Sequence, residues 1–200
     1  MHDHHDQREW QVAVNARTGR LWRLVGAYGG LYALIGSAVI VAVGLVSQQQ
    51  VLGVTRQPLP LVWPLTVVHV TLAQLPLRDV FGPMERVSAR GATSRALRAA
   101  VALLLIGAGI GTYLAARGEH ALLVFCLLLT ALGFTVAAFG RSDCWVWTLG
   151  VGLLTVGLAY ITPLGGPIGG VLDAIPVAAA ATVAVASAVA FIATGRGRRR

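Results

Sequence analysis

Apolar residues fall into six long runs along this chain of 200 residues, and none of the runs contains Asp, Glu, Lys or Arg. A helix needs about 20 predominantly apolar residues to cross the hydrocarbon core of a bilayer, which is about 30 Å thick. Each run meets or approaches that length, so the pattern predicts an all-α membrane protein with six transmembrane helices. The predicted spans are Leu24–Val46, Leu59–Leu77, Ala99–Ala116, Ala121–Phe139, Cys144–Thr162 and Ala174–Thr194.

The polar segments around these runs are too short to form a second domain with its own core. We therefore divide the chain into a cytoplasmic tail at 1–23, a six-helix transmembrane domain at 24–194 and a basic cytoplasmic tail at 195–200. Trp and aliphatic residues are mixed with arginines between Arg8 and Arg23, which is typical of a helix lying on the membrane surface.

Arginine is concentrated in every second gap between the apolar runs. All sixteen basic residues are arginine. Four precede the first span, five lie between the second and third, one lies between the fourth and fifth, and four follow the sixth. Because cytoplasmic loops carry the excess of positive charge, both termini are predicted to be cytoplasmic. The exclusive use of Arg is typical of a GC-rich genome, and we expect a multi-pass protein of a bacterial cell membrane.

The formal net charge of +8 does not indicate a nucleic-acid partner. The arginines flank the apolar runs, where they meet the headgroups of the lipid bilayer and fix the orientation of the chain. Hydrophobic residues make up 56% of the chain and charged residues 12%, whereas about a quarter of the residues of a soluble domain are charged.

Three polar side chains of the second predicted span share one helical face, at the spacing of Thr66, His69 and Gln74. An ionisable group at the depth of His69 is costly in a bilayer and therefore marks a candidate functional site. Two interpretations stay open. The side chains line a cavity, a proton path or a subunit interface, or His69 is a neutral side chain hydrogen-bonded to another helix.

Glycine is frequent in the spans, and small residues let helices approach closely. The third span holds Gly107, Gly109 and Gly111, and the fifth holds Gly150, Gly152 and Gly157. They indicate packing faces, either within the subunit or between subunits.

Gly and Pro are dense between Pro163 and Pro176, so we expect no seventh helix there. Non-helical backbone at membrane depth must be buried in protein or line a cavity. A short re-entrant or interfacial hairpin on the outer face fits the pattern. Asp173 is the lone acid of this segment. It either caps the sixth helix or lines a cavity as a contact for a cation or substrate.

The sequence contains no HExxH, GxSxG or Walker A motif and no pair of carboxylates within a span. The absence of lysine excludes a Schiff-base cofactor. We therefore expect neither an enzyme nor a resident metal or cofactor. Three His and two Asp between Met1 and Asp6 are as typical of a solubilising tail as of a transition-metal site.

The loop between the second and third spans, Arg78–Arg98, is the longest and the most charged. Glu85, Arg86, Arg90 and Gly91 lie within it. Together with six spans, two cytoplasmic termini, an amphipathic lead-in and a Gly/Pro break before the sixth span, this layout resembles the type-2 ABC exporter permeases.

The resemblance implies that the lead-in is an elbow helix and that the Glu85–Gly91 segment couples to a separate cytoplasmic ATPase. It also implies a second permease subunit, the same or a different chain, with the transport path between the two. Two other functions stay open. The chain is a non-catalytic scaffold subunit of a larger membrane complex, or it is the substrate-binding subunit of a small-molecule importer, which would retain a bound ligand after purification.

Overall fold

Long apolar helices account for nearly all of the residues that this computed structural model describes, which are 29–46, 51–52, 59–78, 91–117, 120–139, 143–161 and 167–194. The predicted all-α class is confirmed, apart from one short ladder between two strands of two residues each. The tails at 1–23 and 195–200, with the predicted surface helix, lie outside the described residues.

The helices follow the predicted spans closely, but the second predicted span begins with a two-residue strand, Leu59–Pro60, and two further differences are seen. Their bounds are α2 Gly30–Val46, α3 Val62–Ala73, the 3₁₀ helix η1 Leu75–Leu77, α5 Gly91–Arg117, α6 His120–Ala138, α7 Cys144–Ile161, α8 Pro167–Ala174 and α9 Val177–Ala193, and the strands are β1 Val51–Leu52 and β2 Leu59–Pro60. The third span begins eight residues before the predicted Ala99. The segment before the sixth span contains a helix, α8.

Three described helices, α5, α6 and α7, are long and apolar enough to cross a membrane. The number rises to four if α8 and α9, which meet at an angle of 86°, form one bent span. The remaining apolar helices, α2 and the segment Val62–Leu77, are shorter. Length and composition therefore agree with a multi-pass membrane protein, whereas the six spans that the sequence predicts are not established by the helices alone.

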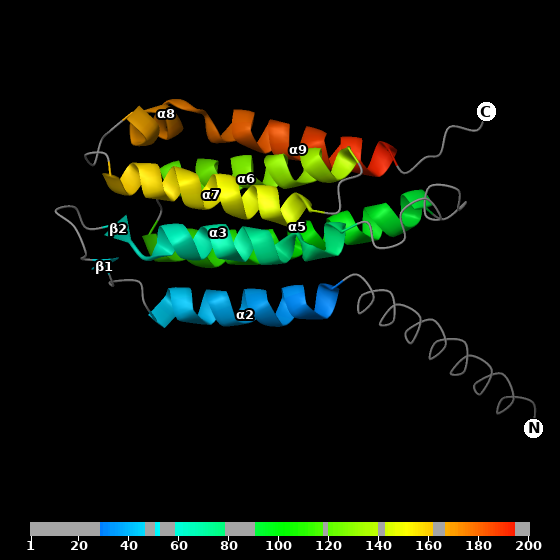
Figure 1. The fold of residues 1–200 in the computed structure, drawn as a ribbon, viewed down its shortest axis with the longest axis horizontal. Helices are drawn as coiled ribbons and strands as arrows, with labels where there is room; N and C mark the ends of the chain where they lie inside the picture. Colours follow the sequence, from blue (N-terminus) through cyan, green and yellow to red (C-terminus); the bar gives the residue numbers. More distant parts are fainter. Residues whose placement is uncertain are drawn as a thin grey trace, which may run out of the picture.

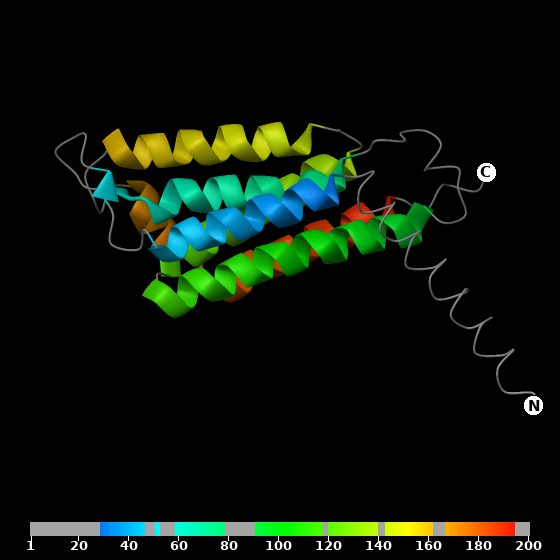
Figure 2. The same ribbon diagram turned by 90° about the horizontal axis from the view of Figure 1, so that it is seen from below.

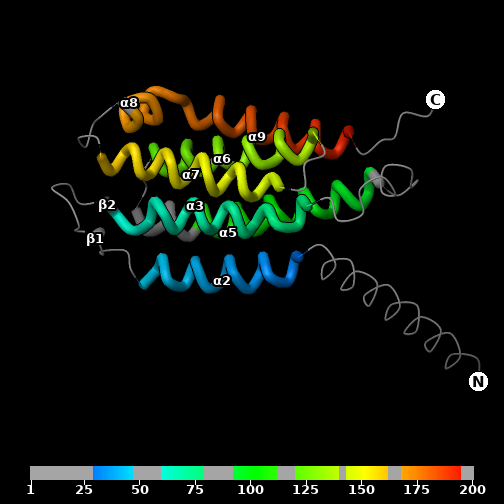
Figure 3. Tube along the Cα trace, in the orientation of Figure 1, coloured from blue at the N-terminus to red at the C-terminus, as the bar shows by residue number. Residues whose placement is uncertain are grey.

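Apart from α8, the helices run side by side along one axis (Figures 1 and 3). Helix α3 contacts α2, α5, α6 and α7. Seen from below, α7 and α5 lie on opposite sides of α3 (Figure 2). Helix α2 begins and α9 ends at the same end of the bundle, where η1 ends and α5 begins (Figure 1). This shared end is called the arginine-rich end below, because the gaps that hold fourteen of the sixteen arginines adjoin it.

Four prolines surround α3 without breaking it. Pro58 and Pro60 precede the helix, and Pro64 lies in its first turn, where the missing N–H has no partner within the helix in any case. Pro76 lies in η1, after the α-helix has ended. The prolines therefore leave α3 as a helix of 12 residues.

Helices α6 and α9 form the most extensive helix pair of the described residues. Ala180, Ala184 and Ala188 repeat every four residues along α9 and are buried, so the two backbones approach closely. The hydroxyl of Thr135 donates to Ser187 Oγ at 3.0 Å across the same pair. The Phe134 and Phe191 rings pack edge to face with centroids 5.9 Å apart.

The sixth span is divided at Ile175 and Pro176. The segment expected to be too broken for a seventh spanning helix contains the eight-residue helix α8, in which Pro167 stands at the first position, where a helix tolerates proline best. Helix α9 then starts after Pro176 with no side-chain cap, so Asp173 does not cap it. The carbonyl of Ile175 lies 3.0 Å from His120 Nε2 and accepts its hydrogen bond, which joins the bend to the start of α6.

Candidate functional site

The polar face of α3 is buried in the middle of the bundle. Thr66, His69 and Gln74 are each at most 1% exposed. Three of the four predicted cavity-lining residues are therefore buried in the core. Asp173 is not among them, because it is exposed near the end of α8.

His69 hydrogen-bonds to a neighbouring helix. Its Nε2 lies 3.1 Å from the carbonyl oxygen of Leu105 in α5. A carbonyl oxygen only accepts, so Nε2 carries the proton in this contact. Gly109 stands one turn further along α5, and a Cβ atom at that position would collide with the His69 ring. The missing side chain of Gly109 is what gives the imidazole access to the carbonyl.

Gln74 repeats this arrangement on α6. Its Nε2 donates to the carbonyl of Leu129 at 3.1 Å. Gly133 follows four residues later, and a Cβ atom there would collide with the Gln74 amide. The same amide also reaches α7, where the Thr148 hydroxyl donates to Gln74 Oε1 at 2.7 Å. The side chain of Gln74, the residue that caps the C-terminus of α3, therefore ties two further helices together.

Apolar side chains of α3 fill two more glycine positions. Val67 packs against Gly152 of α7, and Leu72 packs against Gly36 of α2. Each of the four helices around α3 thus offers one glycine to one side chain of α3. Of the glycines that the sequence marks as packing positions, Gly109 and Gly152 face α3, whereas Gly107, Gly111, Gly150 and Gly157 would place a Cβ in open space.

The two threonines of α3 bond within their own helix. Thr66 Oγ1 donates to Val62 O and Thr71 Oγ1 donates to Val67 O, each at 2.8 Å. The two threonine hydroxyls, the Gln74 amide and His69 Nε2 thus have hydrogen-bond partners in the protein. Of the two interpretations of His69, this geometry favours a structural histidine bonded to another helix over a group that handles protons or substrate.

Two arginines at the arginine-rich end have a structural role that the sequence did not reveal. Arg95 and Arg98 were expected in a charged loop, but they lie in the first turns of α5 and are 3% and 4% exposed. Arg95 Nη1 donates to the carbonyl of Phe191 at 3.3 Å and to Thr194 Oγ1 at 2.8 Å. Arg98 Nη1 donates to the carbonyl of Arg78 at 2.8 Å.

Both guanidinium groups also lie near the Phe191 ring, at 5.3 and 5.7 Å from its centroid. Such distances allow a cation–π attraction. Arginine therefore holds the end of α9 and the end of η1 against α5. The spacing of three residues, which places Arg95 and Arg98 on one helical face, is the signal that could have identified the pair.

Most of the predicted coupling residues cannot be placed. Glu85, Arg86 and Arg90 lie outside the described residues, and Gly91 is the first residue of α5. Among the described residues, no group of three or more His, Cys, Asp or Glu side chains could hold a metal ion. The His and Asp cluster at the start of the chain lies outside them.

No protein-family model, curated protein or solved structure matches this chain.

Proposed function

We propose that this chain is the membrane-spanning permease subunit of an ATP-driven exporter, placed in a bacterial cell membrane by six helices with both termini in the cytoplasm. Helix α2 begins, η1 ends, α5 begins and α9 ends at one end of the bundle (Figure 1). The arginine-rich gaps belong to that end, which the positive-inside rule assigns to the cytoplasm.

The observation that carries the coupling part of the proposal is the arginine contact between α5, α9 and η1. Helix α5 begins directly after the segment proposed to bind the partner and continues to Arg117. Arg95 and Arg98 attach its first turns to Phe191, Thr194 and Arg78. A force applied before Gly91 would therefore move α5 together with the ends of α9 and η1.

ATP hydrolysis must be carried out by another chain. Since the sequence has no Walker A motif, a separate cytoplasmic ATPase would bind at Glu85–Gly91. A second permease subunit, the same or a different chain, would complete the transport path. ATP-driven closure of the ATPase would then alternate the opening of the path between the two faces.

The test is association with the ATPase encoded beside this chain. Residues 85–90 are replaced by a Gly/Ser segment of the same length, which leaves the first residue of α5 intact. The expected result is loss of co-purification. The matched control replaces residues 53–58, a segment of equal length that joins β1 to β2, and should leave co-purification intact. Co-purification that persists after replacement of residues 85–90 would contradict the coupling role of this segment.

A scaffold subunit is the second candidate, and the centre of the bundle supports it. His69, Gln74 and Thr148 are engaged in bonds between helices, which suits a rigid bundle. The two functions differ in the response of the ATPase. An exporter subunit makes ATP hydrolysis in the reconstituted complex depend on transported drugs or lipids, whereas a scaffold leaves the hydrolysis rate unchanged by them.

A further inference from the structure

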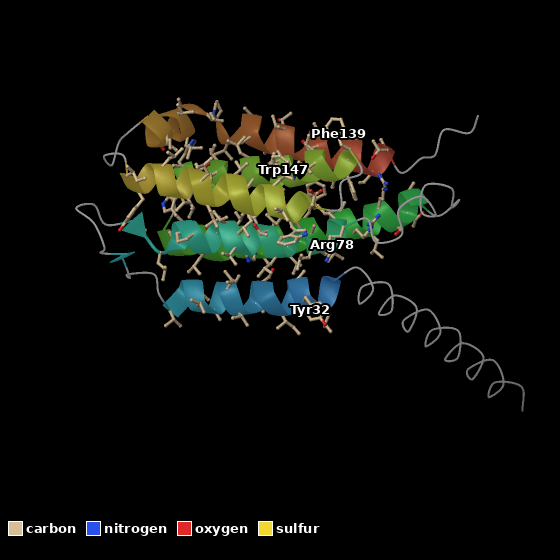
Figure 4. All side chains as sticks on the ribbon, in the orientation of Figure 1. Tyr32, Arg78, Phe139 and Trp147 are labelled. Atoms are coloured by element: carbon tan, nitrogen blue, oxygen red, sulfur yellow. The ribbon has the colours of Figure 1, made fainter. Side chains whose placement is uncertain are left out.

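Exposed aromatic side chains from three helices lie at the level of an exposed arginine near the arginine-rich end. Tyr32 of α2 is 73% exposed, Trp147 of α7 is 47% exposed and Phe139, directly after α6, is 81% exposed. Arg78, directly after η1, is also exposed. In Figure 4 these four side chains lie in a band across the bundle, from α2 through α3 and α7 to α6.

The composition of this band differs from that of the surface beyond it. Further along the helices, the exposed large side chains are aliphatic, as Val39 and Val43 on α2 and Leu154 on α7 show. Tyr and Trp are enriched where hydrocarbon meets water, because each has an apolar body and a polar group. An arginine at the same level can place its charge among lipid phosphates.

The lengths of α6 and α5 place the band at a fitting distance from the opposite end. From Phe139 back to His120 along α6 there are nineteen residue steps, or about 28 Å at 1.5 Å each. Helix α5 gives the same length between Arg98, which binds the Arg78 carbonyl, and Arg117. Both lengths approach the hydrocarbon thickness of about 30 Å.

We propose that Tyr32, Arg78, Phe139 and Trp147 form a belt in the headgroup layer of one leaflet, where Arg78 contacts the phosphates of anionic phospholipids. The inference rests on the membrane location given under the proposed function. Gly91 to Ser94 of α5 then lie beyond the belt, on the aqueous side. At the opposite end α8, turned by 86° from α9, lies in the other headgroup layer.

Charge complementarity favours anionic lipid as the occupant. Apart from the buried Arg95 and Arg98, the gaps adjoining this end hold twelve arginines and six of the eight acidic residues, whereas the opposite gaps hold two of each. Basic residues beside a span are attracted to anionic headgroups near the membrane surface.

The test is depth-dependent quenching of Trp147 fluorescence. The full chain is reconstituted in vesicles of phosphatidylcholine and phosphatidylglycerol that carry a nitroxide near the ester groups or near the methyl end of the acyl chain. The difference between the native chain and Trp147→Phe gives the quenching of Trp147. We expect the shallow nitroxide to quench it more strongly than the deep one.

The matched control moves the tryptophan along the same face of α7. In Trp147→Phe/Leu154→Trp the indole lies seven residues further on, about 10 Å deeper, and the deep nitroxide should quench it more strongly. Preferential quenching of Trp147 by the deep nitroxide, or quenching by neither, overturns the belt. If neither nitroxide quenches the indole at position 154 either, the membrane location of the chain is contradicted.

The lipid charge is tested with the shallow nitroxide on phosphatidylglycerol and on phosphatidylcholine. Trp147 should be quenched more strongly by the anionic lipid, and Arg78→Gln should remove the difference. Arg117→Gln, at the opposite end of α5, is the matched control and should leave it unchanged. Equal quenching of the native chain by both lipids overturns the anionic preference. These experiments need no ATPase, so a failed association leaves them interpretable.

Discussion

Individual glycines determine how the side chains of α3 reach their partners. Leu105 and Leu129 each lie four residues before a glycine, and the carbonyl of each accepts a hydrogen bond from α3. In a helix the side chain at position i+4 stands beside the carbonyl of residue i. Removing that side chain opens the carbonyl to a donor from the neighbouring helix. Each interhelical hydrogen bond therefore depends on the glycine next to it.

Gly109→Ala should destabilise the protein by about 1–3 kcal/mol, the usual cost of overpacking a core. The added methyl group meets the His69 ring. Gly107→Ala is the matched control on the same helix, since its Cβ would meet nothing within 4 Å. It should be neutral or stabilising by up to about 1 kcal/mol through helix propensity. Unfolding in mixed detergent micelles measures both, and equal free energies of unfolding would contradict the proposed fit.

The sequence pattern identified the polar residues of the second predicted span, but not the residues that they contact on the neighbouring helices. The sequence predicted that Thr66, His69 and Gln74 share a face, and the structure places all three in the core. The roles of Gly133 and Thr148 depend on the rotation of α6 and α7 about their axes, which an almost uniformly apolar helix does not encode. For the same reason, the three glycines of α5 could not be separated into inward and outward positions.

At the scale of whole elements, hydrogen bonds and arginine contacts join helices that apolar packing alone would hold less specifically. The Gln74 amide ties α3 to α6 and α7. Arg95 ties α5 to α9, and Arg98 ties α5 to the end of η1. The sequence showed Arg95 and Arg98 as loop charges, because hydropathy ends a span at its first arginine even when the helix continues.

The Gln74–Thr148 contact should give a measurable coupling energy. A double-mutant cycle with Gln74→Leu and Thr148→Val isolates the 2.7 Å bond. Hydrogen bonds between membrane helices contribute about 0.6 kcal/mol on average and up to about 1.7 kcal/mol. We expect a value within that range from unfolding free energies of the four proteins. Strict additivity of the two substitutions would mean that the contact contributes nothing.

Arg95→Met should loosen the end of α9, because the Phe191 carbonyl and the Thr194 hydroxyl lose a charged donor. Hydrogen bonds to charged groups contribute about 1.5–3 kcal/mol. Amide hydrogen exchange should therefore accelerate in the last turn of α9 and remain unchanged in α7. Unaltered exchange in α9 would show that the guanidinium does not hold this end in place.

For the whole molecule, the alternation of arginine-rich and arginine-poor gaps agrees with the direction of the helices, since the gaps of one kind adjoin one end of the bundle (Figure 1). The sequence predicted the helical class and most helix limits, because long apolar runs have few alternatives in lipid. It missed α8, since eight residues rich in Gly and Pro carry little helical signal. The 86° bend at Pro176 follows from the same segment.

The proposed topology has six spans, with the arginine-rich end in the cytoplasm. Single-cysteine labelling tests this topology directly. The buried cysteines Cys126 and Cys144 are first replaced by alanine. One cysteine is then introduced at a time by His5→Cys, Gln49→Cys, Ser88→Cys, Gly165→Cys or Gly197→Cys.

A membrane-impermeant maleimide should label positions 49 and 165 in spheroplasts whose inner membrane is intact. Positions 5, 88 and 197 should react only after that membrane is permeabilised. Labelling of position 88 in intact spheroplasts would contradict the six-span topology, and so would labelling of only one of positions 5 and 197. Either result would remove the cytoplasmic surface on which the proposed ATPase binds.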